Sequence, residues 1–166
     1  MIYLYLYGII RLNKGFVPKK YNEREICMDN RFANSLGGAT LAYLGDAVIE
    51  VLVRRYLVGL GVADGGALSR LALNFVRATA QSAGMDRLEG YLTEDEEYIF
   101  KRGRNAHGIG IPKSASAGEY RRATGMEALF GYLDLCGMEE RKQELFRIAY
   151  ADVMERLENQ ITGEKI

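Results

Sequence analysis

The sequence predicts an all-α fold in which helices are joined by short connections. Apolar residues recur three and four positions apart over most of the chain, which is the spacing of one buried helix face. Pro occurs only 2 times in 166 residues, while Ala, Leu, Arg and Glu, which favour helices, are plentiful. A hydrophobic content of 48% excludes a disordered chain, and the length suffices for one domain with its own core.

Residues 1–33 differ from the rest and are predicted to form a peripheral N-terminal extension. Tyr and Ile are frequent in residues 2–10, and a polar stretch that contains Pro18 follows. Three explanations stay open: a short strand, a disordered tail, or a start codon assigned upstream of the true one, near Met28. The first residues lack a basic start and a small-residue cleavage site, so we do not predict a signal peptide.

The helical domain is predicted to span residues 34–161, with a C-terminal tail at 162–166. Its expected helices cover residues 39–58, 67–85, 93–102, 119–136 and 139–159. The third of these helices opens with a capping box formed by Thr93 and Glu96. Gly103 is expected to end it, since glycine commonly follows the last turn of a helix.

The charge pattern is compatible with a polyanionic partner. Lysine and arginine number 22, as do aspartate and glutamate, so the formal net charge is zero. Residues 101–122 are nevertheless basic, with Glu119 as their only acid, and such a strip can bind a polyanion locally. Cys27 and Cys136 form no metal or redox spacing, which favours a reducing cytoplasm. No apolar run approaches the ~18–20 residues needed to cross a membrane.

Two isolated carboxylates are the strongest indication of a functional site. Asp46 lies within an apolar run, and Glu127 stands at the head of a second one. A carboxylate that loses hydration on burial needs a metal ion or a cationic side chain as its partner. Two such residues on separate helices suggest a shared site between packed helices. Simpler roles stay open for both: a structural hydrogen bond for Asp46, and a capping box with Thr124 for Glu127.

A long connection follows the third predicted helix and carries candidate nucleic-acid contacts. Residues 104–118 are rich in Gly and Ser, and a loop of this length in a compact domain is often functional. Basic and amide side chains in or beside it are candidates for gripping an RNA backbone; they are Lys101, Arg102, Arg104, Asn105 and Lys113. The simpler alternative is a solvated basic face. His107, the only histidine, is a possible general base without an identifiable partner.

Three motifs occur in order along the chain. They are Leu41-Ala42-Tyr43-Leu44-Gly45-Asp46-Ala47-Val48-Ile49-Glu50, then Lys101-Arg102-Gly103-Arg104-Asn105-Ala106 with Pro112-Lys113, then Tyr120-Arg121-x-x-Thr124-Gly125-x-Glu127-Ala128-Leu129. Together they resemble the catalytic domain of the ribonuclease III family, and in particular its small bacterial branch, Mini-ribonuclease III. The resemblance covers roughly residues 34–161, whereas residues 1–27 have no counterpart in it.

The resemblance implies a homodimeric helical endonuclease domain that cleaves double-stranded RNA with Mg²⁺. Asp46 and Glu127 would then be catalytic residues and metal ligands. Larger members of the family use four carboxylates in each site, whereas this chain has Ala42 and Thr124 at the other two positions. The small branch departs from the four-acid pattern in the same way. Water would complete the coordination shell, which suits Mg²⁺ because this ion usually keeps several waters.

The expected substrate is a precursor of large-subunit (23S) ribosomal RNA, and a ribosomal protein is an open further partner. Part of the first helix is expected to form the dimer seam, because four apolar residues on it cannot all face one small core; they are Leu41, Leu44, Val48 and Leu52. Two other functions stay open. One is a catalytically silent ribonuclease III-like domain that binds RNA or assists ribosome assembly, and the other is a helical protein-interaction module. The retained carboxylates favour the enzyme.

Overall fold

The computed structural model describes residues 30–106 and 115–163, with side chains described as far as residue 160. Within these residues all regular elements are helices, which confirms the predicted all-α class. They are α1 (Asn30–Ser35), α2 (Gly38–Gly59), α3 (Gly65–Val76), α4 (Ala78–Leu88), α5 (Glu94–Arg104), α6 (Ala117–Leu135), α7 (Glu139–Ala149) and α8 (Ala151–Gly163). None of these described helices is long and apolar enough to cross a membrane.

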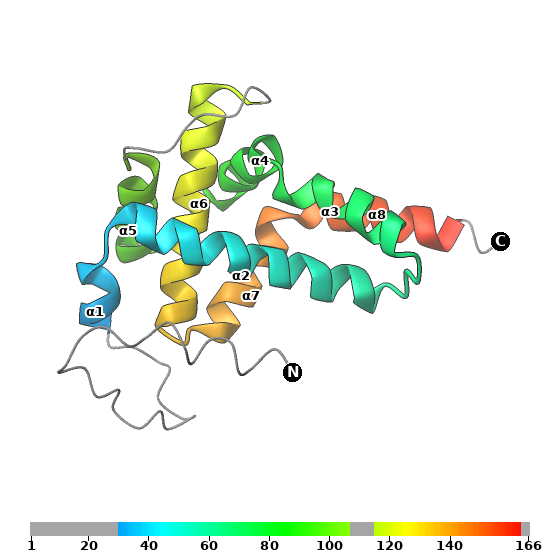
Figure 1. Cartoon of the computed structure of the whole chain (residues 1–166), viewed down its shortest axis with the longest axis horizontal. Coiled ribbons are helices and arrows are strands. Elements are labelled where there is room, and N and C mark those ends of the chain that lie inside the picture. The colour runs from blue at the N-terminus through cyan, green and yellow to red at the C-terminus, as the bar shows by residue number, and fades with distance from the viewer. Residues whose placement is uncertain (1–29, 107–114, 164–166) are drawn as a thin grey trace, which may run out of the picture.

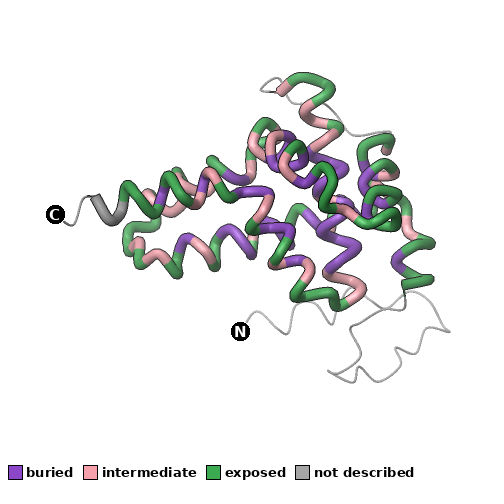
Figure 2. Tube along the Cα trace, turned by 180° about the vertical axis from the view of Figure 1, so that it is seen from behind, coloured by how far each residue is buried: buried purple, intermediate pink, exposed green. Residues whose placement is uncertain are grey.

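Helix α6 is the centre of the domain. Its residues from Ala123 to Leu133 are all buried except Glu127, so this part of the helix is enclosed on every side. A helix that is apolar all round is a core helix. Helix α2 crosses α6, while α5 and α4 pack against it from other directions (Figure 1). Figure 2 shows that the buried segments gather where these helices meet.

Helices α2 and α6 cross in backbone contact, because glycines stand at the crossing. A Cβ atom at Gly45 would collide with the carbonyl group of Glu127, and one at Gly131 would collide with the carbonyl group of Leu41. Protein interiors are close-packed, so neither position has room for a side chain. The contact brings Asp46, the residue after Gly45, to the same crossing as Glu127.

Two of the predicted helices are each divided in two. Region 67–85 consists of α3 and α4, separated at Arg77, whose backbone is extended with φ −68° and ψ 143°. Region 139–159 consists of α7 and α8, separated at Tyr150. The first break follows Phe75 closely and the second lies at Tyr150 itself, and these two rings pack together with centroids 5.2 Å apart. Apolar spacing continues across both breaks, so the sequence pattern did not reveal them.

The expectation that Gly103 ends a helix is wrong. Helix α5 continues to Arg104, and a Cβ atom at Gly103 would collide with that of Ala128 on α6. This glycine therefore permits close packing of two helices and does not stop one. Helix α1 was not expected either. It begins at Asn30, so the predicted domain boundary at residue 34 lies inside it; residues 1–29 lie outside the described part of the chain.

The apolar residues of α2 contradict the reason given for a dimer seam. Leu41, Val48 and Leu52 are buried in the domain's own core, and Leu44 is partly buried against it. The expectation that these four residues cannot all face one core is therefore wrong. The large apolar side chains that α2 exposes are Tyr43, Val51 and Val58, and a contact between copies of the chain through α2 would use these.

Candidate active site

The crossing of α2 and α6 brings the two isolated carboxylates together. Burial and, after it, the negative charge of Asp46 raise the pKa of Glu127 to about 8. Partial burial, followed by the charge of Glu50, raises the pKa of Asp46. Both shifts have the direction expected for carboxylates that lose water and face a like charge. The two carboxyl groups at the crossing therefore resist being ionised together unless a cation joins them.

Neither Asp46 nor Glu127 has a hydrogen-bond or ion-pair partner among the described residues. Glu50, which lies one turn after Asp46, is neutralised by Arg54 through an Nη2–Oε2 contact of 2.7 Å. The positive charge of Arg54 is thus already engaged by another carboxylate. A structural hydrogen bond as the reason for Asp46 gains no support from the described part of the structure.

The capping explanation for Glu127 is wrong. Thr124 lies inside α6, and its hydroxyl group donates a hydrogen bond to the carbonyl oxygen of Tyr120 over 3.1 Å. The cap of α6 is Ser116, which forms a capping box with Glu119. Glu127 therefore lies far inside the helix, where no orphan backbone N–H group needs its carboxylate. The predicted capping box of Thr93 and Glu96 at the start of α5, by contrast, is confirmed.

A cleft of about 590 Å³ opens beside Glu127. One wall comes from α6 and the other from the beginning of α4 and the residues just before it. Its lining residues are Val76, Arg77, Ala78, Thr79, Gln81, Ala115, Tyr120, Ala123 and Glu127. A second hollow of about 370 Å³ lies between α2 and α3 and contains neither Asp46 nor Glu127. Glu127 lines the first cleft and Asp46 does not, so a ligand in this cleft would meet the carboxyl group of Glu127.

The carboxylate pair is more typical of a Mg²⁺ site than of a closed metal site formed by protein ligands alone. No group of three or more His, Cys, Asp or Glu residues that could hold a metal occurs within residues 30–106 and 115–160. Zinc sites in proteins take at least three protein ligands as a rule, whereas Mg²⁺ is commonly bound through one or two carboxylates and several waters. Two partly desolvated carboxylates without a cation match the second pattern.

The basic residues predicted to contact RNA lie in different surroundings. Lys101 forms an exposed ion pair with Glu97, with Nζ and Oε2 2.6 Å apart. Arg104 is exposed and its guanidinium lies 5.9 Å from the ring centroid of Phe100. Asn105 caps the end of α5. Lys113 and His107 lie outside the described residues.

Arg102 is engaged in holding the fold. Its guanidinium donates hydrogen bonds to the carbonyl oxygens of Asn34, over 3.0 Å, and Leu36, and it lies over the ring of Tyr98. These contacts tie the segment between α1 and α2 to α5. The prediction that Arg102 grips RNA is therefore corrected, because its donors satisfy backbone carbonyl groups.

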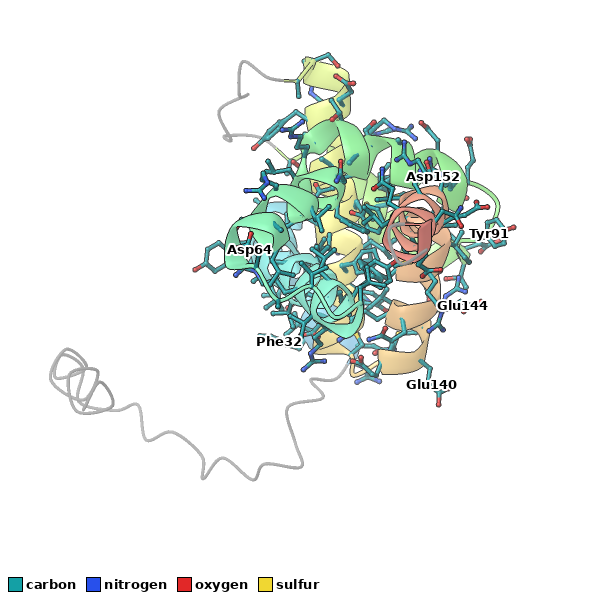
Figure 3. The ribbon with its side chains drawn as sticks, turned by 90° about the vertical axis from the view of Figure 1, so that its right-hand side faces the viewer. Phe32, Asp64, Tyr91, Glu140, Glu144 and Asp152 are labelled. Atoms are coloured by element: carbon teal, nitrogen blue, oxygen red, sulfur yellow. The ribbon has the colours of Figure 1, made fainter. Side chains whose placement is uncertain are left out.

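The acidic side chains of α7 are accompanied by basic ones. Glu140 and Glu144 project outward from α7, on the opposite side of the view from Asp64 (Figure 3). Arg141 pairs with Glu144 over 2.8 Å and Lys142 pairs with Glu139 over 2.6 Å, so two of the three acids of this helix are compensated within it.

Arg77 and Gln81 also line the cleft beside Glu127, although neither was predicted as a site residue. Arg77 would have required knowledge of the break between α3 and α4. Gln81 is one of several polar residues in its segment, and only its burial, with 1% of its surface exposed, distinguishes it. The signal in the sequence was that Gln81 stands in line with Met85 and Leu88, at a position where an amphipathic helix ordinarily has an apolar residue.

Comparison with known proteins places the chain in a family. Residues 39–138 match the family model described as Ribonuclease III domain. Mini-ribonuclease 3 of Symbiobacterium thermophilum is 49% identical over 128 residues, which cover 76% of this chain and 98% of that relative. Mini-ribonuclease 3 of Enterococcus faecalis is 46% identical over 112 residues, or 66% and 85% of the two chains.

A solved structure agrees with these matches. A crystal structure of a protein from Fusobacterium nucleatum superposes with a TM-score of 0.66 at 30% identity, covering 72% of this chain and 92% of that one. The motif around Asp46, the motif around Glu127 and the all-α architecture thus belong to one matched region. The chain is a member of the ribonuclease III domain family, within the group of proteins named Mini-ribonuclease 3.

Proposed function

We propose that this chain is a Mg²⁺-dependent endoribonuclease that hydrolyses double-stranded RNA, in the cytoplasm, during maturation of large-subunit (23S) ribosomal RNA. The observation that carries the proposal is the pair of carboxylates at the α2–α6 crossing, which receives no cation from the described residues. Membership of the ribonuclease III family supports RNA cleavage. Ribosomal RNA as the substrate rests on the resemblance to the small bacterial branch alone.

Asp46 and Glu127 are the proposed metal ligands and catalytic residues. Without a cation, Glu127 keeps its proton up to about pH 8, because burial and Asp46 disfavour its charged form. With a cation bound, Asp46 and Glu127 would hold it as charged carboxylates, and Glu127 would release its proton to solvent. Bound Mg²⁺ would supply an activated water and stabilise negative charge on the phosphate. The backbone contact at Gly45 fixes the relative position of the two ligands before any ion arrives.

The enzyme is proposed to act as a homodimer, because one site can cut only one strand of a duplex. Exposed apolar side chains that suit a contact between copies lie on α2 and α3; they are Tyr43, Val51, Val58 and Leu73. Val58 and Leu73 line one hollow between α2 and α3, and neighbouring exposed apolar groups commonly mark protein contacts. A ribosomal protein as a helper stays a prediction without support.

Duplex RNA is proposed to lie against the end of α5 and the connection that follows it. Arg104, Asn105 and Lys101 are the proposed contacts from the described residues, and Lys113 is retained as a prediction. Such contacts to phosphate and sugar position the RNA without selecting its sequence. Arg102 is left out because the backbone of residues 34–36 occupies its guanidinium.

A catalytically silent RNA-binding domain is the second candidate function. It would explain why Ala42 and Thr124 stand where larger members of the family carry acids, but the small branch shares this departure, and the retained Asp46 and Glu127 favour the enzyme. Both candidates predict RNA binding, so binding cannot distinguish them. Cleavage with a metal requirement does.

The test is incubation of the purified full chain with long double-stranded RNA, with Mg²⁺ or with a chelator. Short duplex products that form only with Mg²⁺ are expected. The matched control is an Asp46→Asn variant, since it keeps the shape of the side chain and removes its charge. RNA that is bound but never cut by the wild type would favour the silent domain.

A further inference from the structure

Gln81 is a polar residue at a position where the fold would ordinarily place an apolar one. Together with Met85 and Leu88 it forms the buried stripe of α4, with the spacing of residues one and two turns apart. Only 1% of its surface is exposed, against 4% for Met85 and none for Leu88. A leucine or methionine would satisfy this position by packing alone. A buried amide at this position therefore needs a hydrogen-bond partner to account for it.

The side-chain amide of Gln81 has no hydrogen-bond partner in the described residues. It carries two N–H donors and an acceptor oxygen, and a buried polar group without partners is destabilising. Its atoms are not sealed in the core, however. Among the described residues, the only enclosed side-chain polar atom without a partner is Asp152 Oδ1. The Gln81 amide therefore borders the cleft that it lines together with Glu127.

The cleft has other polar groups besides the Gln81 amide. Arg77, Thr79 and Glu127 also line it. A buried amide and a carboxyl group that line one hollow of about 590 Å³ are suited to ordered water, which typically takes two to four polar partners.

We propose that Gln81 is a positioning residue of the active site, whose amide hydrogen-bonds water in the coordination shell of the ion held by Asp46 and Glu127. The inference rests on the proposed function, since it presumes a metal at this pair. With only two carboxylates, the site leaves most of the ion's shell to water, and a fixed amide would orient one of those waters. An RNA backbone is too bulky to reach a group that is 1% exposed, whereas a single water can reach it.

The test compares two apolar variants of the full chain, Gln81→Met and Gln81→Leu, with wild type. Melting temperature in EDTA and Mg²⁺ affinity by calorimetry are measured on the protein alone. Both variants are expected to melt at the wild-type temperature or above, because the unpaired amide is gone. The dissociation constant for Mg²⁺ is expected to rise about tenfold, as for loss of an outer-shell partner of a metal ligand.

Ser82→Ala is the matched control. Ser82 is the next residue of α4, is also buried, and does not line the cleft, so its loss should leave the Mg²⁺ affinity unchanged. An unchanged Mg²⁺ dissociation constant in both Gln81 variants would overturn the inference, and so would a clear loss of stability in EDTA in both. A wild type that neither binds Mg²⁺ nor cuts RNA would overturn the proposed function instead.

Discussion

Glu96, which is buried, and Glu127, which is half-buried, have opposite electrostatic surroundings. Glu96 on α5 accepts hydrogen bonds from Arg141 Nε and Nη2, both at 2.9 Å, and from the backbone N–H group of Thr93, also at 2.9 Å. Glu127 on α6 accepts none from the described residues. Burial acts to raise the pKa of Glu96, yet the contacts from Arg141 and Thr93 lower it overall. For Glu127 burial and Asp46 act in the same direction, and its pKa rises to about 8.

The difference separates a structural carboxylate from a functional one. Where the carboxylate only holds helices together, as between α5 and α7, the chain supplies the cation itself. Where it faces a cleft beside a second acid, the described chain supplies none. A buried charge without a partner is costly, so its retention indicates that something outside the chain completes the site.

The largest effect is expected for Asp46→Asn on cleavage. Loss of one of two charged ligands should lower the rate of cleavage of double-stranded RNA by at least about 10³-fold, since metal stabilisation of the reaction amounts to several kcal/mol. Folding and most of the RNA affinity should persist, because Asp46 makes no hydrogen bond or ion pair to a described residue. Single-turnover rates and a binding isotherm check both parts. Near-wild-type turnover would remove Asp46 from the site.

Matched substitutions of the two glutamates should affect stability in opposite ways. Glu96→Gln leaves Arg141 without its charged partner and is expected to destabilise the fold by about 2 kcal/mol, or about 4–8 °C in melting temperature. Glu127→Gln removes a carboxyl group whose ionised form the site disfavours and should leave the metal-free melting temperature equal or higher. Thermal melts of both variants in EDTA provide the measurement. A Glu127→Gln variant that melts well below wild type would contradict the contrast.

The stability of the metal-free protein should fall as pH rises from about 4.5 to 8. In this window the folded state keeps a proton on Glu127, whose pKa is about 8, while the unfolded state with its ordinary pKa of 4.5 has lost it. Glu127→Gln should lack this loss, so its melting temperature should exceed that of wild type by a margin that grows towards pH 8. Melts in EDTA between pH 5 and 8.5 measure the margin.

The lowered pKa of Glu96 acts with the opposite sign and provides an internal control. Its stabilising contribution is present above the unfolded value of 4.5 and is lost as pH falls through the folded value. Glu96→Gln should therefore differ from wild type most at neutral pH and least in acid.

Mg²⁺ should also bind more tightly as pH approaches 8, because less of the protein then holds the competing proton on Glu127. A Mg²⁺ affinity that is flat between pH 6 and 8 would be inconsistent with a protonated Glu127.

Much of the fold followed from apolar spacing, and much of the site from two isolated acids. Helix α2, helix α6 and the cap at Thr93 were predicted because each leaves a local signal. The breaks at Arg77 and Tyr150 leave none, since they are set by packing between residues far apart in the chain. The roles of Gly45 and Gly103 were missed for the same reason: a glycine that ends a helix and one that admits a neighbouring helix look alike in sequence.

The roles of basic residues were also difficult to predict. A lysine or arginine in the sequence does not show whether its side chain is already bonded within the fold. Arg102 donates to the carbonyl oxygens of Asn34 and Leu36, whereas Arg104, two residues later, pairs with no acid among the described residues. Arg104→Ala is therefore expected to weaken binding of all duplex RNA sequences several-fold. It should also reduce the slope of log affinity against log salt by about 1, as for the loss of one phosphate contact.

Arg102→Ala is the matched comparison and should have the opposite profile. It should lower the melting temperature, because two backbone carbonyl groups lose their donor, and it should leave the salt slope unchanged. The two variants therefore distinguish Arg102, which is bonded within the fold, from Arg104, which is available to RNA. Glu96 and Glu127 form the corresponding pair of acidic residues. Binding isotherms on a non-cleaving Asp46→Asn background, at several salt concentrations, distinguish the profiles. If Arg104→Ala shifted the sites of cleavage without changing the salt slope, Arg104 would contact bases and not phosphate.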